Sequence, residues 1–260
     1  MMINKIGSNN LKPIYFTQNQ QSKSQELSLK QKAVILSTST LGAGTVLAGL
    51  AKHKGFSLNP ARIIKTPVKD WALFKYKKGT NAIVFEEPQI IAIATGSVAG
   101  GFVGGSLVDK QNIKAKKREV LNQILGNVLV PVACVGASSR IFEKYSDKII
   151  KIMPTISKET KFAKIINQIS KNTPNAIATI AALGFGIFAG NRVSNLINEK
   201  LYHKKVEREI KASDFAPHVD DLCMSASLMN KESEFGAKLG RVIPFALLVP
   251  GYETGTAQEN

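Results

Sequence analysis

Cysteine, histidine and tryptophan are scarce in this sequence, which limits the chemistry that the chain can perform. Its 260 residues include two cysteines, three histidines and one tryptophan. Cys134 lies in an apolar run and Cys223 in the C-terminal part, and neither has a cysteine or histidine at a metal-ligand spacing. The sequence also contains no phosphate-binding loop and no serine nucleophile elbow. We therefore expect no cofactor, and the sequence favours a non-catalytic protein over an enzyme.

Acidic residues are few relative to basic ones. The chain has 35 Lys and Arg against 19 Asp and Glu, a formal net charge of +16. Such an excess favours anionic partners, either nucleic acid or an anionic lipid surface. A nucleic-acid-binding domain would show a recognised module or basic residues interleaved with aromatics, and neither is present. We expect anionic phospholipid as a partner and no nucleic acid.

Charge is absent from four long runs, at 33–51, 88–108, 120–139 and 172–191. A helix that crosses about 30 Å of hydrocarbon needs roughly 20 residues, and all four runs have about that length. Buried helices of a soluble protein are the alternative, but such helices usually keep a polar face. The sequence therefore predicts an all-α integral membrane helical bundle with four transmembrane helices.

Small residues recur every four positions in the second and fourth runs. Residues four apart share one helical face, and small side chains let two helix backbones approach closely within lipid. We expect these positions to pack helices together, either within the chain or with a membrane partner protein or second copy of a homo-oligomer. They are Gly96, Gly100, Gly104, Ala178, Ala182, Gly186 and Gly190.

The third run is the most polar, with Asn122, Gln123 and Asn127 followed by Pro131. Amides at membrane depth usually face the interior of a bundle. They can pack against one another there, or they can line a path for a solute. Pro131 removes a backbone donor and predicts a kink.

The remaining segments divide the chain into three parts. Residues 1–31 form a predicted flexible polar tail without a cleaved signal, and residues 32–195 form the membrane domain. Residues 196–260 form a basic-to-acidic C-terminal region. Its apolar segment 242–252 is too short to span a membrane, and we expect it to be docked, re-entrant or amphipathic.

Basic segments separate the charge-free runs. Residues 52–87 and 140–171 combine lysines with apolar residues at helical spacing, which is typical of amphipathic helices in the headgroup plane. Packing on the membrane domain is the alternative. The short connection 109–119 holds four residues that we expect at lipid headgroups: Lys114, Lys116, Lys117 and Arg118.

One polar cluster in the C-terminal region is a candidate metal site. In a helix, Asp214, His218 and Asp221 would share one face, and mixed oxygen and nitrogen ligands suit zinc, manganese or iron. The alternative is a helix that begins at Pro217, with the acids next to its positive end.

The stretch KGFSLNPARII at 54–64 resembles the Asn-Pro-Ala box of the aquaporin family. That family has two boxes and six spans, whereas this chain has one box and four full-length runs. We therefore assign no family, and we expect Asn59 to cap a helix that begins at Pro60.

These features favour a multi-pass protein of a bacterial cytoplasmic (inner) membrane that acts as a scaffold or assembly factor. A small-solute channel or transporter is the alternative, and a metal-dependent membrane enzyme is the second alternative.

Overall fold

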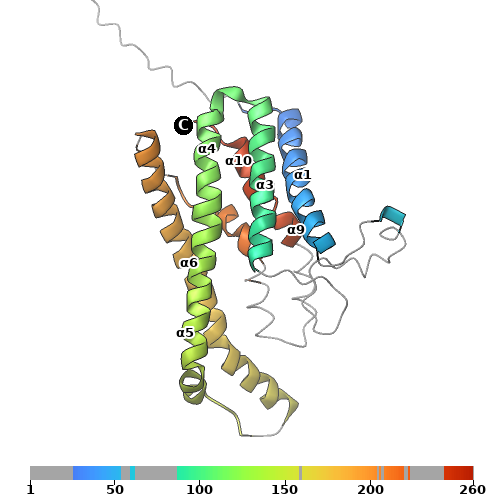
Figure 1. Ribbon diagram of the computed structural model, residues 1–260. Helices are drawn as coiled ribbons and strands as arrows, with labels where there is room; N and C mark the ends of the chain where they lie inside the picture. The colour runs from blue at the N-terminus through green and yellow to red at the C-terminus, as the bar shows by residue number, and fades with distance from the viewer. Residues whose placement is uncertain are drawn as a thin grey trace, which may run out of the picture.

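The computed structural model describes residues 26–53, 59–61, 87–157, 160–203, 205, 208–219, 222 and 243–259. Helices and their connections make up this part of the chain, and no strand occurs in it. The all-α class predicted from the sequence is confirmed. Figure 1 shows upright helices α1, α3 and α4 side by side, with α5 continuing α4 downward and α6 crossing beside it.

The first helix, α1 (Leu29–His53), contains the first charge-free run. Its start is fixed by reciprocal bonds of a capping box. The main-chain nitrogen of Ser28 donates to Gln31 Oε1 at 2.9 Å, and the nitrogen of Gln31 donates to Ser28 Oγ at 3.4 Å. The helix therefore begins inside the predicted tail 1–31, whose first 25 residues lie outside the described part.

Helix α3 (Glu87–Val108) lies against α1 along a row of glycines. A Cβ atom built on Gly96 would come within 2.8 Å of the Gly42 oxygen, and one on Gly104 within 3.2 Å of the Ile35 Cα atom. Gly100 lies against the main chain of Thr38. Because these positions have no side chains, the two backbones are in direct contact.

A single long rod follows α3. It consists of η2 (Lys110–Asn112), α4 (Ile113–Leu121), the π-helical turn η3 (Asn122–Leu129) and α5 (Val130–Ile152). Pro131 stands directly after the π-helical turn. Since proline has no N–H to donate to the carbonyl four residues earlier, the wider turn accommodates the loss. The predicted disturbance at Pro131 therefore takes the form of a π-helical segment.

Helix α6 (Lys161–Tyr202) packs along this rod. Thr160 Oγ1 caps its start by accepting from the Ala163 nitrogen at 3.1 Å. A Cβ on Gly186 would meet Pro131, and Gly190 lies against the main chain of Gly126. The closest approach of the two helices is therefore at the π-helical turn.

The C-terminal region supplies three short elements: η4 (Ala212–His218), α9 (Ile243–Ala246) and α10 (Val249–Thr256). Helix α10 is docked against α3, because Gly251 and Gly255 lie against the main chains of Gly101 and Gly105. Of the three arrangements considered for segment 242–252, its described residues, 243–252, show the docked one, although Phe245 is exposed. An apolar core joins these elements, formed by Ala43, Ala51, Ile93, Ala94, Val128, Ile243 and Leu247.

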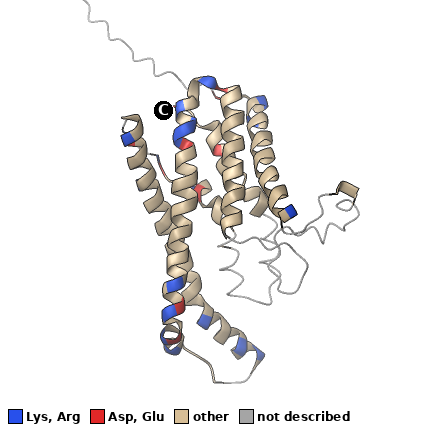
Figure 2. Cartoon of the chain, viewed as in Figure 1, with Lys and Arg blue, Asp and Glu red and all other residues tan. Residues whose placement is uncertain are grey.

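Four helices are long and apolar enough to cross a membrane, at Leu29–His53, Pro88–Val108, Lys110–Ile152 and Lys161–Tyr202. Apolar side chains on their outer surfaces are exposed, among them Leu36, Leu107 and Phe185. Lys, Arg, Asp and Glu are gathered mostly toward the two ends of the molecule (Figure 2). The fold is that of a multi-pass helical membrane protein.

The predicted amphipathic segment 140–171 is helical over 140–152 and 161–171, where it belongs to α5 and α6. Residues up to Ile152 prolong α5, and residues from Lys161 begin α6, so the segment is a hairpin that extends both helices. Segment 52–87 lies mostly outside the described residues. Within it, Asn59 Oδ1 accepts from the Ala61 nitrogen at 2.9 Å, which is the capping bond expected there.

Candidate functional site

Arg208 lies at the centre of a buried polar cluster that joins distant parts of the chain. Its guanidinium bonds Asp214 Oδ2 through Nη1 at 2.8 Å and Asp214 Oδ1 through Nη2 at 2.6 Å. Its Nε bonds both carboxylate oxygens of Glu119 at 3.1 Å. Its Nη2 is also 3.5 Å from Glu253 Oε2. One guanidinium therefore ties the α6–η4 connection to α4 and to α10.

Two amides extend this cluster along the rod. Gln123 Nε2 donates to Glu119 Oε1 at 2.7 Å and to Glu253 Oε2 at 2.6 Å. Asn127 Nδ2 donates to Gln123 Oε1 at 3.1 Å and to Asp214 Oδ1 at 2.6 Å. Since residues four apart share a helical face, Glu119, Gln123 and Asn127 form one polar stripe. We call Arg208, Glu119, Gln123, Asn127, Asp214 and Glu253 the Arg208 cluster.

The ionised forms of Asp214 and Arg208 stabilise each other. Burial alone raises the pKa of Asp214, but bonds from Arg208, the Lys211 nitrogen and Asn127 outweigh it and hold that pKa below its ordinary value. Burial likewise disfavours the charged form of Arg208, but Asp214 and Glu119 raise its pKa above the ordinary value. The pair is therefore an ion pair at neutral pH.

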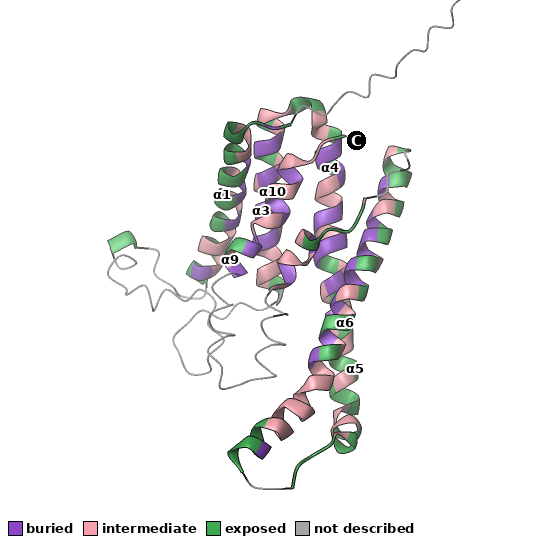
Figure 3. Ribbon diagram, turned by 180° about the vertical axis from the view of Figure 1, so that it is seen from behind, coloured by how far each residue is buried: buried purple, intermediate pink, exposed green. Residues whose placement is uncertain are grey.

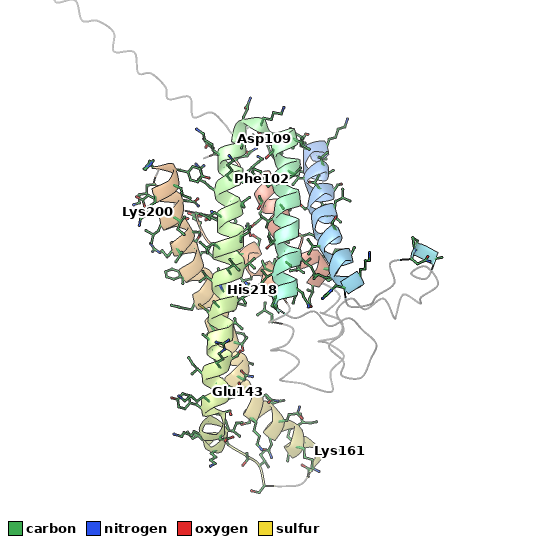
Figure 4. The ribbon with its side chains drawn as sticks, viewed as in Figure 1. Phe102, Asp109, Glu143, Lys161, Lys200 and His218 are labelled. Carbon is green, nitrogen blue, oxygen red and sulfur yellow. The ribbon has the colours of Figure 1, made fainter. Side chains whose placement is uncertain are left out.

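His218 closes the inner end of the cluster. It lies about midway along the rod (Figure 4), and its Nε2 is 2.7 Å from the main-chain oxygen of Asn127. A carbonyl oxygen only accepts, so Nε2 carries the proton. In an α-helical pattern this oxygen would bond the nitrogen of residue 131, which is proline. His218 thus supplies a donor that Pro131 does not.

The structure does not assemble the predicted metal site from its described residues. Asp214 is bound to Arg208, and His218 is directed to the Asn127 carbonyl. The helix expected over 214–221 is instead a 3-10 turn that ends at His218, and Asp221 lies outside the described residues. Within the described ranges, no three His, Cys, Asp or Glu residues are placed to hold a metal ion.

A cavity of about 730 Å³ adjoins the Arg208 cluster. The outer turns of α4, the segment 208–213 and α10 with the residues after it form its walls. Most of the residues that line it are polar or charged, including Arg118, Glu119, Asn122, Arg208, Lys211, Ser213, Tyr252 and Glu253. Its volume is in the range of sites that hold small organic ligands.

The predicted path residues all lie at or beside this cluster, where their side chains bond other parts of the chain. Gln123 and Asn127 are buried and bonded as described above. Asn122 Oδ1 accepts from Asn198 Nδ2 at 3.2 Å, and Asn122 also lines the cavity. These three amides therefore hold α4, η3, α6 and the C-terminal elements together.

Two of the four predicted headgroup residues are buried. Lys116 is fully buried, and its Nζ donates to Asp109 Oδ2 at 2.8 Å and to the Ala257 oxygen at 2.9 Å. Arg118 is 3.5 Å from Glu259. Both side chains point inward because they bind the C-terminal end, which corrects the expectation that they face lipid. Lys114 and Lys117 are exposed on the opposite face of α4.

The predicted packing residues lie at helix contacts to different degrees. Gly96, Gly100 and Gly104 face α1, and Gly186 and Gly190 face the rod. Ala178 and Ala182 are half-buried: the Ala178 oxygen accepts from Ser138 Oγ of α5 at 3.4 Å, and Ala182 packs against a cluster that includes Val135 of α5. All these contacts are within one chain.

Sequence reasoning did not single out Glu119, Arg208 or Glu253. Glu119 could have been found, because it precedes Gln123 by four residues on the same helical face. Arg208 and Glu253 lie in separate C-terminal segments and have no spacing that relates them to the rod.

No protein-family model, curated protein or solved structure matches the chain. The fold alone defines the class, a multi-pass helical membrane protein.

Proposed function

We propose that the chain is a non-catalytic scaffold or assembly factor of a bacterial cytoplasmic membrane. In this function, α1 contacts a partner helix, either of another membrane protein or of a second copy. The observation that carries the proposal is the poor coverage of α1 by the other described helices.

Helix α1 is the least buried of the four membrane-crossing helices. In its most apolar window 17 % of the residues are buried, against 39 % in each of the other three. Its inner face, with Gly42, packs on α3, whereas its outer face is exposed (Figure 3). A Cβ atom on Gly44 or Gly49 would meet nothing within 4 Å. Small outward-facing residues allow a second helix to approach closely in lipid.

Anionic phospholipid is the proposed lipid partner. Lys114 and Lys117 are exposed beside the α3–α4 connection. The hairpin at the other end combines exposed lysines with exposed apolar side chains, including Ile141, Tyr145 and Phe162. Attraction between the lysines and anionic headgroups, together with burial of the apolar side chains in the interface, stabilises binding of this hairpin to the membrane surface. The glycine ladders would then hold the chain together while basic segments rest on the surface.

Association of the chain in membranes tests the scaffold function. Gly44→Leu places a large side chain on the outer face of α1, and we expect it to reduce co-purification of a partner or cross-linking between copies. Gly184→Leu is the matched control, because a Cβ there also meets nothing within 4 Å but lies on α6. Both variants should keep the wild-type melting temperature. Wild-type chain that stays monomeric and partner-free in its native membrane would contradict the proposal.

The cavity beside Arg208 favours a solute channel or transporter as the second candidate. It has the volume of a ligand site and an ionisable lining, which at the boundary of a membrane bundle often marks a solute path. Transport would require uptake by proteoliposomes that a substitution of the cavity-lining amide, Asn122→Ala, abolishes without loss of insertion. If no solute that binds the protein is taken up, the transport function is contradicted and only the scaffold function remains.

A further inference from the structure

The Arg208 cluster contains more negative than positive charge. Nη2 of Arg208 is 2.6 Å from Asp214, 3.0 Å from Glu119 and 3.5 Å from Glu253. One guanidinium thus serves three carboxylates, all of them at most 15 % exposed. Uncompensated charge is costly to bury. A further cation at this wall would lower that cost.

Other charged residues of the cavity do not provide the missing charge. Arg118 is paired with Glu259 at 3.5 Å. Lys211 is exposed, and Glu209 on the same segment offsets its charge. Among the residues that the structure describes, the excess negative charge therefore remains at Glu119 and Glu253. Gln123 Nε2 bonds both carboxylates, at 2.7 and 2.6 Å, and so holds them side by side.

A buried acceptor behind the cavity lining also lacks a donor. Among the described residues, Asn198 Oδ1 has no hydrogen-bond partner, although Asn198 is only 2 % exposed. Its amide nitrogen bonds Asn122, which lines the cavity. A ligand that brings several N–H donors suits a wall with surplus acceptors.

The size and lining of the cavity point to an organic ligand. A volume of about 730 Å³ is far larger than a bare ion needs, and Val249 and Tyr252 add apolar surface. Ammonium and guanidinium groups form strong charge-assisted bonds with paired carboxylates.

We propose that this cavity binds a small organic cation whose ammonium or guanidinium group lies between Glu119 and Glu253. The same chemistry occurs on free amines and on the ethanolamine headgroup of a phospholipid. The proposal does not depend on the scaffold function, because it concerns the cavity beside the Arg208 cluster and not the outer face of α1.

Isothermal titration of the full-length chain in detergent with n-butylammonium and n-butylguanidinium tests the proposal. Neutral n-butanol and the butyrate anion are the matched probes without a positive charge. We expect saturable binding of both cations and of neither control. Failure of both cations to bind at millimolar concentrations would overturn the proposal. The same result is expected if protons, and not an organic cation, neutralise the carboxylates, so that case also counts against the proposal.

Substitution of one carboxylate locates the site. Glu253→Gln keeps the shape and removes the charge, and we expect about tenfold weaker binding of n-butylammonium. Glu119→Gln should weaken binding to the same extent, and this variant is used if Glu253→Gln does not fold. Glu143→Gln removes an exposed carboxylate of α5 outside the cavity lining and should bind as the wild type does. Unchanged affinity in folded Glu253→Gln and Glu119→Gln would overturn the site.

Nanodiscs distinguish the two sources of the cation. Phosphatidylglycerol discs with and without phosphatidylethanolamine are titrated with n-butylammonium. Weaker apparent affinity in the presence of phosphatidylethanolamine supports a lipid headgroup as the occupant. Equal affinity in both discs supports a soluble amine.

Discussion

The Nε2 atom of His218 lies 2.7 Å from the main-chain oxygen of Asn127, four residues before Pro131. Because Pro131 has no N–H to donate to this oxygen, the His218 side chain, from a distant segment, donates to it instead. This contact attaches η4 to the π-helical turn of the rod. It also gives the buried His218 ring a hydrogen-bond partner.

A double-mutant cycle tests this relationship. His218→Leu keeps much of the volume and removes the donor, which should cost about 1–2 kcal/mol of unfolding free energy in detergent. In a Pro131→Ala background the new N–H can bond Asn127, so the same substitution should cost at least about 1 kcal/mol less. Equal costs in the two backgrounds would show that the histidine does not substitute for the missing donor.

Gly100→Leu should prevent α1 from packing on α3. An ideal Cβ at this position would lie 2.9 Å from the Thr38 carbonyl carbon, which is part of the backbone and unable to move aside. We expect loss of the cooperative thermal transition and loss of a cross-link between cysteines placed on α1 and α3. Gly44→Leu, on the open face of α1, should retain both. Gly100→Leu with a wild-type transition would refute the close helix contact.

Lys116→Met should weaken the attachment of the C-terminal end. The Lys116 amine is fully buried and bonds Asp109 and the Ala257 oxygen, so its removal leaves two acceptors without this donor. A hydrogen bond to a charged group contributes about 1.5–3 kcal/mol, and we expect destabilisation of that order together with faster proteolysis after α10. The neighbouring, exposed Lys117 provides the control: Lys117→Met should change neither property. Equal behaviour of the two variants would argue against the buried pair.

The stability of the fold should fall in acid partly through Asp214. The pKa of Asp214 is lower in the folded chain than in the unfolded chain because its carboxylate bonds Arg208. Its ionised form therefore stabilises the fold above about pH 4, and this contribution is lost as the pH falls through the folded-state pKa. Melting temperatures between about pH 5 and pH 3 should fall less steeply in Asp214→Asn than in the wild type.

Asp109 provides the matched control for this pH dependence. Its pKa is also lowered, since bonds from Lys116 and Asn112 outweigh the effect of burial. Asp109→Asn should therefore remove a separate part of the acid sensitivity, and the two effects should add in the double variant. A wild-type slope in Asp214→Asn would contradict the ion pair with Arg208.

The sequence was sufficient to predict the fold class and the four membrane-crossing helices, because uncharged runs of bilayer length rarely occur outside membrane-spanning segments. It also indicated that Gln123 and Asn127 face the interior. It could not relate them to Arg208 and Glu253, since those residues come from segments whose positions depend on tertiary packing. The inward orientation of Lys116 was missed for the same reason: its acceptors include the distant Ala257 oxygen.

The boundaries of the rod were harder to predict than its existence. Charge begins at Arg140, yet α5 continues to Ile152 and α6 begins at Lys161, well before the fourth uncharged run. Helical hydrogen bonding does not stop where the surrounding medium changes, so hydropathy marks the lipid-facing part and not the helix ends.

Fractionation of membranes from cells that express the full chain tests the central claim most directly. If lipid surrounds the four apolar helices, the protein should stay in the pellet through alkaline carbonate and high-salt washes and dissolve only when detergent is added. Recovery of folded, monodisperse chain in the detergent-free supernatant would contradict a membrane-spanning bundle.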